Sequence, residues 1–223
     1  MQELKIEDAV PVLPSWINGR AFLSLTAGFA EVKNAAGKVL RRTPLCGADE
    51  VAIAVVGAEA ALPAWTALQT GERQNFLIAW SHALEKYAAH FAHLISEETD
   101  VDEAAAGDEV AAAIVALRAG LQSAMCAKNE AGKIVACVWN TPLALDAIVN
   151  LIAPILHAGG VIIVKPCAQS PGAVFALCEL SARVGIPAGV VNLVQGEDAV
   201  LAAFAEHRAV RLVQGVQTQS PHL

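Results

Sequence analysis

The alternation of short apolar segments with longer helical segments over residues 134–213 constrains the fold more than any other feature of the sequence. The four apolar segments have the length and composition of buried strands: Ile134–Val138, Val161–Lys165, Val190–Val194 and Val210–Val213. The segments between them are predicted helices: Leu143–Leu156, Gly172–Val184 and Asp198–His207. Strands and helices that alternate in this way form βαβ units with parallel strands. We therefore expect an α/β fold with a Rossmann-like parallel sheet and flanking helices, incomplete because the sequence stops soon after the last strand.

The first 130 residues show other patterns. Asn-Gly in WINGR and the glycine of NAAGKVL are turn signals, which predict an N-terminal β-hairpin region over residues 15–46. Three helices are expected next: Glu50–Trp65 with Asp49 as N-cap and Pro63 as a kink or end, then Gly71–Thr99 and Asp102–Met125. The sequence therefore predicts one domain over residues 1–223, made of a β segment (1–46), a helical segment (47–130) and a partial Rossmann-like segment (131–223).

Charge and composition argue against several classes of function. The chain carries 22 acidic and 15 basic residues and has no basic run, so nucleic acid is not expected as a partner. The N-terminus has no signal-peptide pattern, and polar residues interrupt the apolar run at Leu143–Ala158, so no membrane segment is expected. Five scattered cysteines without a CxxC pair are typical of reduced thiols. A cytoplasmic location is expected.

Polar residues lie at the carboxyl ends of two of the predicted strands. Asn140 comes after the strand at Ile134–Val138, and Lys165 ends the strand at Val161–Lys165. Ligands of parallel α/β sheets bind at the carboxyl ends of strands, so these two side chains predict a site. Two alternatives remain open: Asn140 is also a favoured helix cap, and Lys165 could be a solvated charge at a strand end.

Other candidates have plainer explanations. Cys137 and Cys167 lie near Asn140 and could act as nucleophiles, but free cysteines in strand patterns are usually small core residues. His90, His93 and Glu97 share a helical face and could bind a metal, whereas a charged outer face explains them equally well. Aromatic residues at helical spacing are interpreted as core packing and not as a cofactor site: Trp80, Tyr87 and Phe91.

Several motifs together resemble one known family. WINGR, the hairpin ending in GKVLRRTPL, the PAW element at 63–65 and the helices ending in ISEETD look like the N-terminal part of aldehyde dehydrogenases. VWNTPL resembles that family's Pro-Trp-Asn-aromatic-Pro motif. AGGVIIVKPCAQSP resembles its AGN-x-V-V-x-KPSEQTP segment, and GIPAGVVNLVQG its G-x-P-x-G-V-x-N-x-V-x-G segment. The matches occur in the family's order over nearly all of the chain, which corresponds to the first half of a typical member.

The resemblance implies an activity, a cofactor and site residues. Family members oxidise aldehydes with NAD or NADP. Asn140 matches the asparagine that donates to the oxyanion, and Trp139 matches a residue that lines the cofactor cleft. Lys165 matches the lysine that binds the adenosine ribose. Gly196 matches the glycine at the adenine, and Gly215 the first glycine of the pyrophosphate turn.

The chain also departs from the family pattern. Ala168 stands where the family has the glutamate that partners the ribose lysine, and Val216 and Ser220 replace small residues of the phosphate turn. The family's nucleophilic cysteine and general-base glutamate would lie beyond Leu223, and none of the five cysteines has the family's Gly-Gln-x-Cys setting. Without a thiolate nucleophile, covalent aldehyde oxidation is not expected of this chain alone.

Three functional hypotheses follow. The first is a truncated or degenerate aldehyde dehydrogenase, a pseudoenzyme derived from NAD(P)-dependent oxidoreductases. The second is a non-catalytic assembly or regulatory subunit that forms a homo-oligomer or pairs with a complete dehydrogenase, because an unfinished sheet leaves an edge to be covered. The third is a residual nucleotide-binding module.

Overall fold

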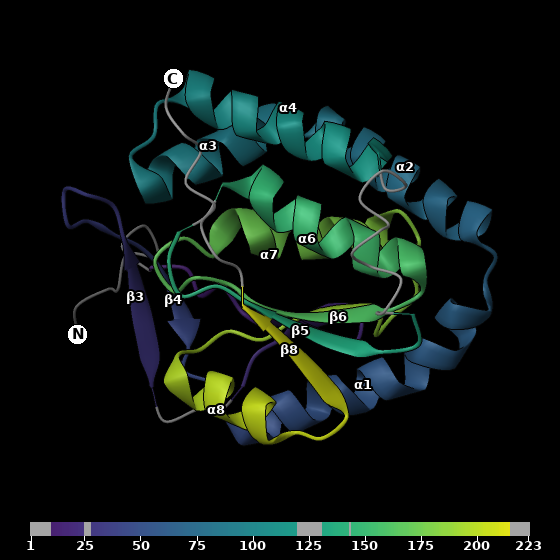
Figure 1. The fold of residues 1–223 in the computed structure, drawn as a ribbon. Coiled ribbons are helices and arrows are strands. Elements are labelled where there is room, and N and C mark those ends of the chain that lie inside the picture. Colours follow the sequence, from purple (N-terminus) through teal and green to yellow (C-terminus); the bar gives the residue numbers. More distant parts are fainter. Residues whose placement is uncertain (1–9, 25–27, 120–130, 143, 215–223) are drawn as a thin grey trace, which may run out of the picture.

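The computed structural model describes residues 10–24, 28–119, 131–142 and 144–214. Helices cover both faces of a central sheet in this part of the chain, which confirms the predicted α/β class (Figure 1). The sheet contains β1 (Ser15–Ile17), β2 (Arg20–Phe22), β5 (Ile134–Val138), β6 (Val161–Lys165), β7 (Val191–Leu193) and β8 (Val210–Gln214). A separate antiparallel pair is formed by β3 (Phe29–Lys33) and β4 (Val39–Pro44).

The strand order of the sheet is β2-β1-β7-β6-β5-β8. The four strands β7, β6, β5 and β8 are parallel, and β5 and β6 have the bounds that their apolar runs predict. The chain proceeds from β5 outward through β6 to β7 and then crosses to β8 on the other side of β5. Such a reversal of direction is where doubly wound sheets bind ligands, outside the carboxyl ends of the strands.

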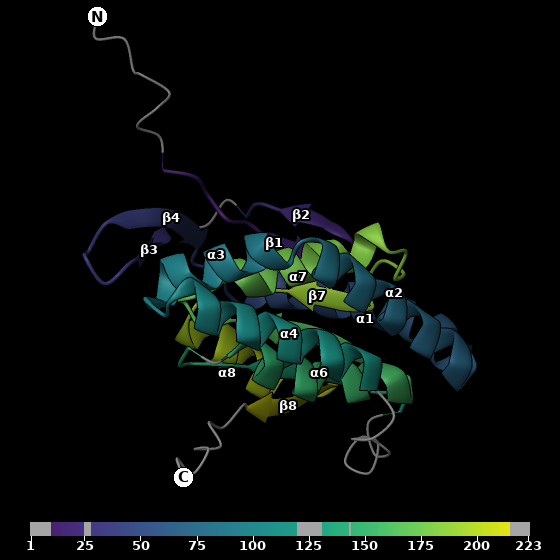
Figure 2. The same ribbon diagram turned by 90° about the horizontal axis from the view of Figure 1, so that it is seen from above.

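Helices pack on both faces of the sheet, and on one face a second layer of helices covers the first (Figure 1 and Figure 2). On one face, α6 (Leu145–Ala158) and α7 (Gly172–Arg183) follow β5 and β6, and an outer group covers them: α2 (Thr70–Lys86), α3 (Ala88–Thr99) and α4 (Glu103–Ala119). On the other face lie α1 (Ala48–Ala67) and α8 (Asp198–Glu206). Because both faces of the parallel strands are covered, every residue of β5, β6 and β7 is buried.

The N-terminal hairpin joins this sheet as an antiparallel edge, an arrangement that the sequence did not predict. The Asn-Gly turn does form as expected, with φ of 55° at Asn18 and 73° at Gly19. Trp16 of β1 then pairs with Leu193 of β7. A buried amide secures the junction, because Asn192 Oδ1 accepts from the Asn18 backbone N–H at 2.9 Å.

Glycines allow close packing at the same junction. Gly189 has φ +87°, and a Cβ there would lie 2.4 Å from the Gly57 carbonyl oxygen. A Cβ on Gly57 would in turn lie 3.3 Å from Asn18 Oδ1. The hairpin, α1 and the turn before β7 therefore meet at backbone distance.

Two helix predictions require correction. The helix expected over Gly71–Thr99 is two helices, because Tyr87 (φ −107°, ψ 16°) ends α2 and α3 begins directly after it. Trp80 and Phe91 are buried as predicted, but the prediction of Tyr87 as a core residue was wrong, because Tyr87 at the break is 37% exposed. The apolar period in the sequence runs across this position, so the sequence pattern does not show the break. In α1, Gly47 and not Asp49 is the N-cap, and Pro63 lies inside a helix that continues to Ala67.

A buried arginine joins the ends of α1 and α6. Arg73 is 6% exposed, and its Nε donates to the His157 carbonyl at 2.8 Å. Its Nη1 donates to the carbonyls of Leu68 and, at 3.3 Å, Thr66. The guanidinium thus lies between two helix C-termini, whose partial negative charge favours a cation.

One described helix, α1, is by length and composition long and apolar enough to cross a membrane. Core helices that are mostly buried in a sheet layer pass the same test. Here the inner side of α1 packs on β5, β6 and β7, whereas Ile53 and Val56 on its outer side are exposed.

Candidate functional site

Asn140 and Lys165 meet at the carboxyl edge of the sheet. Val138, the last residue of β5, pairs with Lys165, the last residue of β6. The backbone N–H of Trp139 donates to the Lys165 carbonyl at 3.0 Å and extends this pairing by one residue. Lys165 Nζ then donates to Asn140 Oδ1 at 3.4 Å. The structure therefore brings these two predicted residues together, as expected from neighbouring strand ends.

Lys165 is a buried cation with spare hydrogen-bonding capacity. It is 3% exposed, and burial lowers the pKa of its ammonium, while Cys167, Asp198 and Glu197 act in the opposite direction. An ammonium has three donors, and the acceptors recorded for this one are Asn140 Oδ1 and the Pro166 carbonyl, both at 3.4 Å. No residue of the described ranges forms an ion pair with it. Such a group suits a ligand hydroxyl or phosphate oxygen.

Asn140 does not cap the following helix, so that alternative interpretation was wrong. The N-cap of α6 is Ala144, and the Leu145 N–H donates instead to Glu109 Oε2 at 3.2 Å. The Asn140 side chain is exposed and its oxygen faces Lys165. Its amide N–H groups therefore remain available as hydrogen-bond donors at the sheet edge.

The other predicted site residues are placed differently. Gly196 has φ +133°, and a Cβ there would lie 2.7 Å from Val200 Cγ2 and 3.1 Å from the Cys46 carbonyl, so the backbone is closely packed at this position. Trp139 is 2% exposed and belongs to the core, so it offers little surface to a ligand. Gly215 lies outside the described residues, as do Val216 and Ser220.

The described cysteines are all buried. Cys137 is fully enclosed in β5, and Cys167 is 5% exposed with its Sγ 3.7 Å from the Asn140 carbonyl oxygen. Burial raises the pKa of Cys46 to about 11 and also raises that of Cys178. Since the thiolate is the nucleophilic form, Cys46 and Cys178 are not suited to attack a carbonyl at neutral pH.

Two of the three residues proposed as metal ligands, His93 and Glu97, instead contact charged side chains of the protein. Glu97 forms an ion pair with Arg41, and His93 Nδ1 lies 3.4 Å from Glu103 Oε1. Within the described ranges, no group of three or more His, Cys, Asp or Glu residues is placed to hold a metal ion.

Glu98, which was not identified from the sequence, is a buried carboxylate that contacts the start of α7 after the loop at residues 166–171. Glu98 in α3 accepts from the Gly172 N–H, the first residue of α7, at 2.9 Å. Its other oxygen lies 3.2 Å from Arg41 Nε. The signal was present as Glu98 in ISEETD, but only the fold shows that it anchors the helix after the KPCAQSP loop.

Glu98 predicts a pH dependence of stability. Burial raises its pKa to about 7 in spite of the Arg41 charge and the Gly172 N–H. A raised carboxyl pKa contributes stability that is fully present below the unfolded pKa and is lost as the pH rises through 7. We expect the free energy of unfolding to fall by about 2 kcal/mol between pH 5 and pH 8 through this group. Urea unfolding at several pH values measures it.

The Glu98→Gln variant should lack this part of the pH dependence, because its side chain stays neutral. Glu85→Gln is the matched control, since Glu85 is 58% exposed and pairs with Arg118 at the surface. If wild type became more stable than Glu98→Gln as the pH rose from 5 to 8, the ion pair with Arg41 would outweigh burial and the expectation would be wrong.

The strand order, with its polar carboxyl edge at a reversal of direction, defines a doubly wound α/β protein. The profile of the aldehyde dehydrogenase family matches residues 24–216. The chain therefore belongs to the aldehyde dehydrogenase family.

Individual relatives agree with this assignment. Succinate-semialdehyde dehydrogenase [NADP(+)] of Escherichia coli (strain K12) is 33% identical over 199 residues, which are 81% of this chain and 41% of that protein. The crystal structure of an E. coli NADP-dependent enzyme has a TM-score of 0.81 at 27% identity, covering 91% of this chain and 46% of that chain. PnpE in complex with nicotinamide adenine dinucleotide has a TM-score of 0.81 at 26% identity, covering 90% and 45%. The chain spans less than half the length of each of these proteins.

Proposed function

We propose that this chain supplies the cofactor-binding side of an aldehyde-oxidising site and binds NAD or NADP at the Lys165 edge. The observation that supports this most is the buried Lys165 ammonium, which has two long hydrogen bonds and lies beside Asn140. The relatives described above include an NADP enzyme and a complex with nicotinamide adenine dinucleotide. A bound nicotinamide would serve as the hydride acceptor.

The residues of the edge would have separate tasks. Lys165 would donate hydrogen bonds to cofactor hydroxyl groups. Gly196 would offer its backbone to the adenine end of the cofactor, while its Cβ position is already occupied by packing against Val200 and Cys46. Asn140 would donate its amide N–H to the oxygen of the aldehyde-derived oxyanion, and one such donor stabilises a transition state by roughly 3–4 kcal/mol. Ala168 leaves the lysine without the family's glutamate partner.

We further propose that the 223-residue chain does not oxidise aldehydes by itself. Support comes from the buried cysteines, of which Cys46 and Cys178 have raised pKa values. The assay follows NADH formation by the purified chain with succinate semialdehyde, glutarate semialdehyde and a simple aliphatic aldehyde. We expect no turnover, and aldehyde-dependent NADH formation at a rate proportional to the protein concentration would refute the proposal.

Cofactor binding is tested by the Lys165→Met variant. We expect saturable binding of NAD or NADP to wild type in calorimetry and at least a tenfold weaker affinity in Lys165→Met, since a charge-assisted hydrogen bond is lost from a buried site. Lys133→Met is the control, because Lys133 is exposed and lies before the amino end of β5, at the opposite edge of the sheet. Absence of both heat and a melting-temperature shift with wild type would rule out the proposed binding and the nucleotide-binding module alike.

A second candidate function is assembly. In the described residues β8 pairs on one side with β5 and has no strand on its other side, and its Leu212 and Val213 are half-buried. Proteins cover such edges. We infer that this chain forms a homo-oligomer or pairs with a complete dehydrogenase through this edge. Light scattering of the pure chain, alone and mixed with a full-length relative, measures it; a stable monomer in both samples would contradict it.

A further inference from the structure

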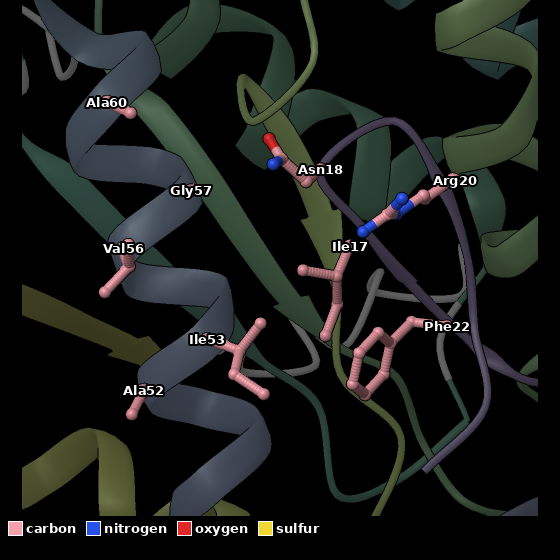
Figure 3. Close-up of a pocket in the computed structure, with 9 residues that line it drawn as sticks. All are labelled: Ile17, Asn18, Arg20, Phe22, Ala52, Ile53, Val56, Gly57 and Ala60. Atoms are coloured by element: carbon pink, nitrogen blue, oxygen red, sulfur yellow. The ribbon is translucent and has the colours of Figure 1, made fainter.

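A groove runs between the outer side of α1 and the β1–β2 hairpin (Figure 3). Its volume is about 380 Å³, within the range of small-ligand sites. All of its lining residues except Asn18 and Arg20 are apolar or glycine: Ile17, Phe22, Ala52, Ile53, Val56, Gly57 and Ala60. It shares no residue with the candidate cofactor site.

The apolar walls of the groove are open to water. Ile53 is 46% exposed and Val56 is 64% exposed, on a helix whose inner side is buried. Phe22 of the hairpin faces Ile53 across the groove, and Ile17, 2% exposed, forms its floor. A ligand with an aliphatic chain would remove these side chains from water, which favours binding.

The polar end of the groove carries an unpaired positive charge. The Arg20 guanidinium extends from β2 toward Ile17 and Asn18 (Figure 3). Among the described residues no acidic side chain forms an ion pair with Arg20, and none lines the groove. The Asn18 side-chain amide points away from Arg20 toward Gly57 of α1, so the guanidinium is the charged group of this end (Figure 3). The groove is thus complementary to a molecule with one anionic end and an apolar chain.

We propose that this groove binds an aliphatic monocarboxylate of medium chain length. Its carboxylate accepts hydrogen bonds from the Arg20 guanidinium, whose planar fork matches the two carboxylate oxygens. Its chain lies along Ile53 and Val56 of α1 and against Phe22 of the hairpin. The proposal is independent of nucleotide binding at Lys165, and the two sites can be occupied together.

The probe is octanoate, titrated into the whole chain and followed by the methyl NMR signals of Ile53 and Val56. We expect saturable shifts of these methyl groups. The affinity should rise from butanoate through hexanoate to octanoate by up to about fourfold for each methylene that is buried. Octanol, which has the same chain without the charge, should bind several times more weakly.

Two surface variants separate the charge from the chain. Arg20→Gln should weaken octanoate binding by about three- to tenfold and leave octanol binding unchanged. Val56→Asp places a carboxylate in the groove and should abolish octanoate binding. Val115→Asp is its control, because Val115 on α4 is equally exposed, at 63% against 64%, and lies off the groove. Circular dichroism and melting temperatures verify that each variant folds.

Each contrary outcome is decisive. Octanoate that fails to saturate the Ile53 and Val56 shifts at millimolar concentration overturns the proposal. So does equal octanoate affinity in wild type and Arg20→Gln, or equal loss in Val56→Asp and Val115→Asp. Concentration-dependent shifts of the same methyl groups without ligand would show that a second copy of the chain occupies the groove, and this too would overturn it.

Discussion

Replacement of Arg73 by methionine should lower the free energy of unfolding by about 3–5 kcal/mol, one of the two largest effects that we expect. The guanidinium satisfies backbone carbonyls at the ends of α1 and α6, including those of Leu68 and His157. Methionine fills a similar volume but cannot donate, so these buried acceptors lose their partners. Urea unfolding of wild type and variant measures the difference.

Two further variants make this result specific. Arg73→Lys retains the charge without the planar fork, so we expect an intermediate loss. Arg183→Met removes an arginine that is 59% exposed and pairs with Glu179 one turn away, and should cost no more than about 0.5 kcal/mol. An Arg73→Met variant as stable as Arg183→Met would show that solvent satisfies the carbonyls and that the buried arginine is not required.

The second large effect is expected for Gly189→Ala, at about 3–5 kcal/mol of unfolding free energy. The alanine Cβ would lie 2.4 Å from the Gly57 carbonyl oxygen and 3.0 Å from Ala61 Cβ. Backbone cannot yield as a side chain can, so the turn before β7 would have to move away from α1. The positive φ adds conformational strain to this clash.

Gly37→Ala isolates the strain from the clash. Gly37 has φ +78°, but a Cβ there meets nothing within 4 Å. We expect this variant to lose only about 1 kcal/mol. Thermal and urea unfolding of both variants should therefore differ clearly, and equal losses would mean that the close approach of α1 and β7 relaxes without cost.

The parallel part of the sheet was predictable because its strands are continuous apolar runs. Ile134–Val138 and Val161–Lys165 are short runs between helical segments, apolar except for the terminal lysine, which favours strands covered on both faces, and their bounds agree with β5 and β6. The break at Tyr87 was not predictable, since the apolar period runs through it. The pairing of β1 with β7 was also not predictable, because the residues of a hairpin turn do not indicate which distant strand the hairpin will pair with.

The candidate site was predictable to the extent that it is local. Asn140 follows β5 and Lys165 is the last residue of β6, and the carboxyl ends of neighbouring parallel strands lie close together. The roles of Glu98 and Arg73 could not be predicted in this way, because their hydrogen-bond partners lie on elements far away in sequence. Tertiary packing determines which polar groups meet over long sequence distances. The hydrophobic periodicity of a sequence indicates only which side of a helix or strand is apolar.

The attachment of the N-terminal hairpin to β7 imposes an order on folding. The bond between Asn18 and Asn192 spans 174 positions in sequence, so β1 cannot complete its pairing until β7 has been synthesised. Contacts of such high sequence separation form late and slowly. During synthesis the edge of β1 stays unpaired, and a chaperone or a fused N-terminal partner that holds this hairpin would therefore alter the yield of folded protein more than its final stability.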